Sequence, residues 1–134
     1  MEPTPGASCL WEVLGEHVDL ESFLEVYSTA YNREIDYLDV LVWERDGIEA
    51  FFKSYVGLDC LELIDLRIRG CGSEALSLLK GYAEWPEVSR IIMEGDCIEL
   101  VVPPDPPLRV VEALRKLGYR GKISAKAYRP SESW

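Results

Sequence analysis

Four cysteines and one histidine are the residues of this chain with the most specific chemistry. The cysteines, at positions 9, 60, 71 and 97, include no C-x-x-C pair, so their spacing matches no standard zinc pattern. Cys71 precedes a predicted helix, where exposed N–H groups and the macrodipole stabilise a thiolate. The hypotheses for Cys71 are a catalytic or redox thiol, and a small apolar residue in a turn. Because His17 is the only histidine, no Ser-His-Asp or Cys-His arrangement can be located.

Carboxylates are the second group that could hold a ligand. Clustered acids bind Mg²⁺ or Ca²⁺ through oxygen, and acids bracket two predicted strands at Asp36, Asp39, Glu44, Asp59, Glu62 and Asp65. The chain has 24 acidic against 14 basic residues and a formal net charge of −10, so acids are common throughout it. We interpret these clusters as solvated faces and helix caps, and we expect neither a metal ion nor a cofactor.

The elements that position these groups begin with a helix and a strand. Asp19 is a good N-cap for a helix over residues 20–32. The apolar stripe of this helix is Leu20, Phe23, Leu24, Tyr27 and Tyr31. Residues 37–44 are rich in β-formers and nearly continuous in apolar character, which predicts a strand covered on both faces.

A second helix is predicted after this strand. Asp46 and Glu49 have the spacing of a capping box, and Gly57 is a suitable C-terminal residue. The apolar positions Ile48, Phe51, Phe52 and Tyr55 recur at helical spacing between them. The first 57 residues therefore predict helix, strand and helix.

From residue 60 the pattern predicts strand, helix, strand, strand, helix and strand. The strands cover residues 60–69, 88–94, 97–102 and 122–128, and the helices follow Ser73 and Asp105 as N-caps. Gly95-Asp96 joins the two middle strands as a hairpin. Pro106 is placed at the first helical position, and Gly118 at the end of the last helix. In the first strand, Ile64, Leu66 and Ile68 face one way and Asp65, Arg67 and Arg69 the other.

This order over residues 60–128 resembles the ferredoxin-like βαββαβ superfold, and within it the regulatory modules of the ACT and RAM type. The resemblance implies an α+β fold and binding of small effectors at module interfaces. We expect one compact domain, with residues 1–57 packed as an extension on a ferredoxin-like unit over residues 58–134. The extension could extend the sheet, cover its open face, or form a dimer contact.

Two predictions follow from that topology. The first and third strands are antiparallel neighbours, so the end of the first at Cys71 lies beside the start of the third at Cys97. The two thiols can form a disulfide if their Cα atoms fall within about 7 Å, and the alternative is two unpaired buried cysteines. The sheet face without helices would carry four candidate anchors for an anionic ligand: Arg67, Arg69, Lys126 and Tyr128.

Composition narrows the function classes. The excess of acids opposes binding to nucleic acids, no apolar run reaches the roughly 18 residues of a membrane span, and the N-terminus lacks the pattern of a signal peptide. We therefore expect a cytoplasmic protein, and the absence of Gln together with a single Asn suggests a hot environment.

The expected function is a non-enzymatic regulatory or interaction module. It would bind a small anionic ligand or a protein partner, as a homodimer. The alternatives are an enzyme that uses Cys71 or clustered acids, and an accessory subunit of a larger complex.

Overall fold

The computed structural model describes residues 8–57 and 60–129 of the chain. Its helices are α1 (Leu10–Leu14), α2 (Leu20–Asn32), α3 (Ser73–Tyr82) and α4 (Pro107–Leu117), with a 3₁₀ turn over Gly15–His17. Its strands are β1 (Ser8–Cys9), β2 (Tyr37–Arg45), β3 (Ile48–Val56), β4 (Leu61–Cys71), β5 (Arg90–Glu94), β6 (Cys97–Val102) and β7 (Ser124–Arg129). The α+β class is as expected.

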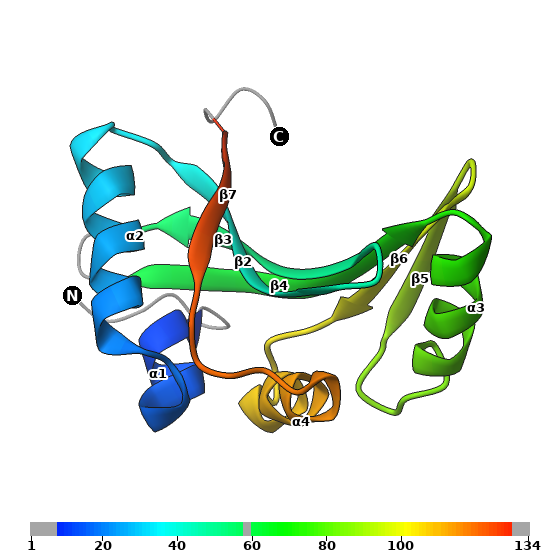
Figure 1. The fold of residues 1–134 in the computed structure, drawn as a ribbon. Coiled ribbons are helices and arrows are strands. Elements are labelled where there is room, and N and C mark those ends of the chain that lie inside the picture. Colours follow the sequence, from blue (N-terminus) through cyan, green and yellow to red (C-terminus); the bar gives the residue numbers. More distant parts are fainter. Residues whose placement is uncertain (1–7, 58–59, 130–134) are drawn as a thin grey trace.

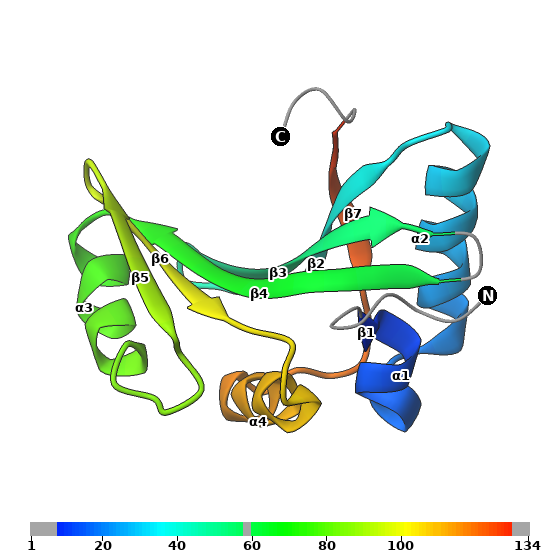
Figure 2. The same ribbon diagram turned by 180° about the vertical axis from the view of Figure 1, so that it is seen from behind.

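The strands form one curved antiparallel sheet in the order β5-β6-β4-β3-β2-β7, and the short β1 pairs with β4. The four helices lie on one side of this sheet (Figures 1 and 2). Their buried side chains join the inward-facing strand residues in one apolar cluster, to which residues on both sides of position 57 contribute. Among the described residues, no helix has the length and apolar character needed to cross a membrane.

The ferredoxin-like topology predicted for residues 60–128 is only partly present. β4, β6 and β5 are neighbours in the predicted order, but β7 does not pair with β4 as the βαββαβ unit requires. The β2–β3 hairpin occupies that edge of β4, and β7 pairs with β2 instead. Of the three placements considered for the N-terminal residues, the structure therefore has the one that extends the sheet.

The predicted helix over residues 46–57 is wrong, because this segment is strand β3. Asp46 and Gly47 form a two-residue turn, with φ of 53° and 79°, between the paired residues Arg45 and Ile48. Two positive φ values are typical of the tight hairpin turn that follows the right-handed twist of the strands. The spacing of Asp46 and Glu49 therefore belongs to a hairpin and not to a capping box.

A β-bulge at Ile64 interrupts the regular alternation that was predicted for β4. The pairing with β3 passes from Lys53–Asp65 to Ser54–Leu63, so Ile64 is the extra residue. Ile64 is exposed, whereas Leu63 and Leu66 are both buried in the core. The bulge thus allows one strand to bury apolar side chains on the same face before and after it.

Helix α2 has the predicted bounds and cap but a different buried face. The Asp19 carboxylate accepts a hydrogen bond from the Ser22 N–H at 3.0 Å, which confirms the N-cap. Its buried residues are Phe23, Val26 and Ala30. Three members of the predicted stripe, Leu20, Leu24 and Tyr31, are exposed instead.

The remaining helix ends are close to those predicted. Gly118 is the C-cap of α4 with a left-handed φ of 85°, as expected. The N-caps are each displaced by one residue, to Gly72 for α3 and Pro106 for α4, so Ser73 and Asp105 do not cap. The bounds of β6 and the Gly95-Asp96 hairpin agree with the prediction.

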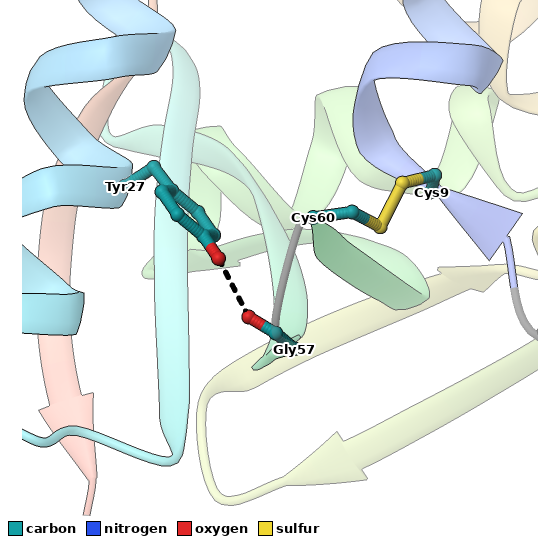
Figure 3. Close-up of a disulfide and its surroundings, with 4 residues drawn as sticks. All are labelled: Cys9, Tyr27, Gly57 and Cys60. Atoms are coloured by element: carbon teal, nitrogen blue, oxygen red, sulfur yellow. Dashed lines mark hydrogen bonds between the residues drawn. A yellow bond between two sulfur atoms is a disulfide. The ribbon is translucent and has the colours of Figure 1, made fainter. Parts of the chain in front are cut away.

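A disulfide between Cys9 and Cys60 ties β1 to the segment before β4 (Figure 3). Beside it the Tyr27 hydroxyl donates a hydrogen bond to the Gly57 carbonyl at 2.7 Å. Together they fix the end of β3 and the start of β4 against α2 and β1. The Cys9–Cys60 pairing was not predicted from the sequence.

Gly70 provides a test of the packing between β4 and α3. A Cβ atom there would lie 2.9 Å from the Ala75 Cβ and 3.0 Å from a Leu79 methyl. We expect Gly70→Ala to lower the free energy of unfolding by about 1–3 kcal/mol through overpacking. The control is Gly81→Ala in helix α3, where a Cβ atom would have open space around it. This substitution should be neutral or stabilising by about 0.5–1 kcal/mol. Urea denaturation measures both, and equal effects would contradict the packing described.

Candidate anion-binding pocket

Arg67, the first predicted anchor, lies on the helix-free face of the sheet but is already neutralised. Its guanidinium donates to both carboxylate oxygens of Asp65, at 2.6 and 3.0 Å, and to Glu99 at 2.7 Å. Burial alone would lower the pKa of Arg67, but the hydrogen bonds and charges of Asp65 and Glu99 raise it above its ordinary value. These contacts use the guanidinium fork that an anionic ligand would need.

The other predicted anchors do not converge with Arg67. Arg69 is exposed and lies between Glu49 and Glu99 on the neighbouring strands. Lys126 and Tyr128 belong to β7, and their side chains lie outside the described part of the structure. Because β2 and β3 separate β7 from β4, the two pairs of residues are three strand spacings apart, roughly 14 Å.

Cys71 and Cys97 are directly opposite each other on β4 and β6, the adjacency predicted from the strand order. Their Cα atoms are 4.0 Å apart, and their sulfur atoms are joined at 2.00 Å. The Asp96 carboxylate lies nearby, 3.6 Å from the Cys97 sulfur. With both sulfurs in a disulfide, this cluster offers neither a free thiolate for catalysis nor thiolate ligands for a metal.

A basic hollow lies on the helical side, where α1 and the 3₁₀ turn meet the C-terminal half of α4. Its volume is about 390 Å³, within the usual range for small-molecule pockets. Leu14 and Leu114, both buried, form part of an apolar wall. The lining residues are Leu14, His17, Val111, Leu114, Arg115, Tyr119, Arg120 and Gly121.

The loop after α4 forms one wall of this pocket and is held at both ends. At its start, the N–H groups of Gly118 and Tyr119 donate to the Leu114 carbonyl at 3.1 and 3.0 Å. Further along, the Gly121 carbonyl accepts a hydrogen bond from the backbone N–H of Asp19 at 2.6 Å. Gly121 has a φ of +93°, and a Cβ there would lie 3.1 Å from the His17 carbonyl. The wall therefore depends on glycine at this close approach.

Tyr119 places a polar atom in an otherwise apolar part of the wall. Its hydroxyl is buried and has no hydrogen-bond partner among the described residues. Burial, together with the nearby charge of Asp19, raises the pKa of Tyr119 above its ordinary value, so the phenol stays neutral. The hydroxyl therefore has an unused hydrogen-bonding capacity, but protein atoms cover it, so a ligand reaches it only after the Tyr119 side chain turns toward the pocket.

Positive charge gathers around this pocket in a protein whose net charge is −10. Arg115 is paired with Glu112, and Lys116 donates to Glu87 at 2.8 and 2.9 Å. Within the described chain, Arg120 makes no ion pair closer than 4.0 Å. Arg120 also lines a second hollow beside β2, together with Lys122. Arg120 therefore lines both hollows and has no ion-pair partner among the described residues.

This site was not among those predicted from the sequence, although the sequence contains one signal for it. Residues 115–122 contain four basic residues and no acid, which is unusual in so acidic a chain. A local run of this kind indicates a positive surface. Its combination with His17 and Leu14 could not be read from sequence, because it depends on how α1 docks against α4.

Comparisons with known proteins do not assign this chain to a family. No family model, no curated protein and no solved structure matches it.

The two disulfides can be tested by peptide mapping without reduction. We expect linked peptides that contain Cys71 with Cys97 and Cys9 with Cys60. The double variant Cys71→Ser/Cys97→Ser should lose about 3 kcal/mol of unfolding free energy, because a loop of 26 residues is no longer closed in the unfolded chain. Cys9→Ser/Cys60→Ser is the matched comparison. Free thiols at Cys71 and Cys97 in air-oxidised protein would refute the pairing.

The burial of Tyr119 should affect how the stability of the protein depends on alkaline pH. Because its pKa is higher in the folded state than the value of about 10 in the unfolded chain, its contribution to stability is complete below pH 10 and is lost as the pH rises further. Tyr119→Phe should therefore weaken the decline of stability above about pH 10. At neutral pH the variant should be unchanged or more stable by up to about 1 kcal/mol. Tyr31→Phe, at an exposed position, is the control, and identical pH profiles for all three proteins would contradict the burial of Tyr119.

Proposed function

We propose that this chain is a non-enzymatic binding module for a small organic anion, a carboxylate with an apolar body, held in the pocket between α1 and α4. The observation that carries the proposal is the meeting of an unpaired Arg120 with the buried, unpartnered Tyr119 hydroxyl beside an apolar wall. Arg120 would bind the carboxylate, and Leu14 and Leu114 would contact the apolar part. The Tyr119 hydroxyl, which is covered in this structure, would turn toward the ligand and donate a hydrogen bond.

The chemistry of the lining supports binding and not catalysis. His17 and Tyr119 are the groups of this pocket that could transfer a proton, and the raised pKa of Tyr119 opposes its ionisation near neutral pH. Among the residues whose side chains the structure describes, the lining holds no cysteine, serine or carboxylate that could serve as a nucleophile. A regulatory or interaction role, in which the ligand changes the behaviour of the module, is the role that this set of groups fits best.

Binding can be measured by NMR titration of ¹⁵N-labelled protein with hexanoate and benzoate, and with hexanamide and benzamide as neutral analogues. We expect hexanoate and benzoate to shift the backbone N–H signals of residues 118–121. Hexanamide and benzamide should bind at least about tenfold more weakly, because they lack the charge-assisted hydrogen bond. Arg120→Met should reduce carboxylate affinity by about tenfold or more, and Tyr119→Phe by about fivefold.

Arg69→Met is the matched control, since it removes the same charge from the helix-free face of the sheet. It should leave carboxylate binding unchanged. If Arg69→Met weakens binding while Arg120→Met does not, the ligand site is the sheet face predicted from the sequence. If carboxylates and neutral amides bind equally, the proposed anion site is wrong.

A further inference from the structure

Strand β5 forms one edge of the sheet. It pairs with β6 on one side, and no strand of the described chain pairs with its other side (Figure 2). An edge strand presents a row of N–H and C=O groups that pairs with another chain unless a proline, a bulge or an inward-pointing charge prevents it. β5 contains no proline and keeps a regular register over all five residues, Arg90–Glu94.

The side chains of this edge are apolar where they face the helical side of the sheet. Ile91 and Met93 lie opposite the core residues Leu100 and Ile98, yet they are 49% and 70% exposed. Leu78 of α3, on the same side of the sheet, is 44% exposed. Ile91 and Met93 thus form an uncovered continuation of the core at the sheet edge.

The sequence of β5, Arg-Ile-Ile-Met-Glu, is complementary to itself in the antiparallel direction. We propose that β5 pairs with β5 of a second copy of this chain, about a twofold axis at Ile92, so that two sheets join into one. In this register Arg90 lies opposite the partner's Glu94, and Ile91 opposite the partner's Met93. Ile92 lies opposite the partner's Ile92.

Three features select this occupant and this register. Opposite charges meet at both ends of the paired strands, and the apolar pairs meet between them. The contact is isologous, which is the arrangement of a closed twofold dimer. A shift by two residues would place Arg90 opposite Ile92 and remove both charge pairs. A partner strand of a different sequence would need an acid opposite Arg90, a base opposite Glu94 and three apolar residues between them.

The dimer is expected to be reversible. Five-residue strands with one flanking helix bury less than the roughly 1,200 Å² of a standard stable interface. Each copy also carries a net charge of −10, so repulsion between copies should weaken association at low ionic strength. The dimer population should therefore increase with protein concentration and with salt.

Sedimentation equilibrium of the full chain at 150 and 500 mM NaCl tests the proposal. Wild-type protein should show a concentration-dependent dimer. Arg90→Glu and Glu94→Arg should each raise the dissociation constant by roughly tenfold or more, because like charges then face each other at both ends. The double variant R90E/E94R restores opposite charges and should restore the dimer. Arg45→Glu, an exposed charge reversal on the β2–β3 turn, is the control and should have no such effect.

A cysteine at the axis gives a second measurement that does not depend on charge. Ile92→Cys should form an intermolecular disulfide under mild oxidation, since the two Cα atoms would lie about 5 Å apart across the axis. Ile91→Cys should not, because the two copies of position 91 would be separated by about 8 Å, beyond the reach of a disulfide. A monomer at all concentrations, or a dimer indifferent to Arg90→Glu and cross-linked equally at both positions, would overturn the proposal.

Discussion

The two-residue turn at Asp46-Gly47 determines the topology of this protein. Its two positive φ values reverse the chain within the hairpin, so β2 and β3 pair along their whole lengths. β3 then pairs with β4 and occupies the edge that a ferredoxin-like unit would give to its last strand. β7 has to pair with β2 instead, and the loop after α4 must cross below the sheet to reach it (Figure 1). The pocket between α1 and α4 lies on that crossing, so its existence depends on the turn.

The sequence patterns predicted single elements better than their assembly. The bounds of α2, β2 and β6 follow from periodicity and caps that act within a few residues. The segment 48–56 was ambiguous because Ile48, Phe51, Phe52 and Tyr55 satisfy helical spacing while also having strong preferences for strands. The dipeptide Asp46-Gly47 was the deciding signal, and it favours a hairpin over a capping box. The bulge at Ile64 could not be predicted, because it arises from the register that β3 imposes on β4.

Among the candidate sites too, contacts between neighbouring strands could be predicted from the sequence, whereas contacts that depend on the packing of distant elements could not. The adjacency of Cys71 and Cys97 depends only on β4 and β6 being neighbours, and that part of the predicted strand order is correct. The convergence of Arg67 with Lys126 failed because it required β7 to lie beside β4. Arg67 also pairs with the Glu99 carboxylate on the neighbouring strand, a contact that a linear pattern does not reveal. The environment of Tyr119 depends on the docking of α1, so no spacing rule could have predicted its buried hydroxyl.

The two disulfides hold opposite ends of the same strand. Cys60 immediately precedes β4 and Cys71 is its last residue, so β4 is the link between two covalent rings with sequence separations of 51 and 26 residues. Once the non-covalent contacts break, a pulling force applied at the two termini would pass through the sulfur bridges, along β4 and along the chain after Cys97, and the residues inside the rings would not carry it. The chain in its oxidised form should therefore extend much less in a force–extension measurement than the reduced chain. In mechanical terms β4 connects the two rings, which enclose α1, α2, β2 and β3 on one side and α3 and β5 on the other.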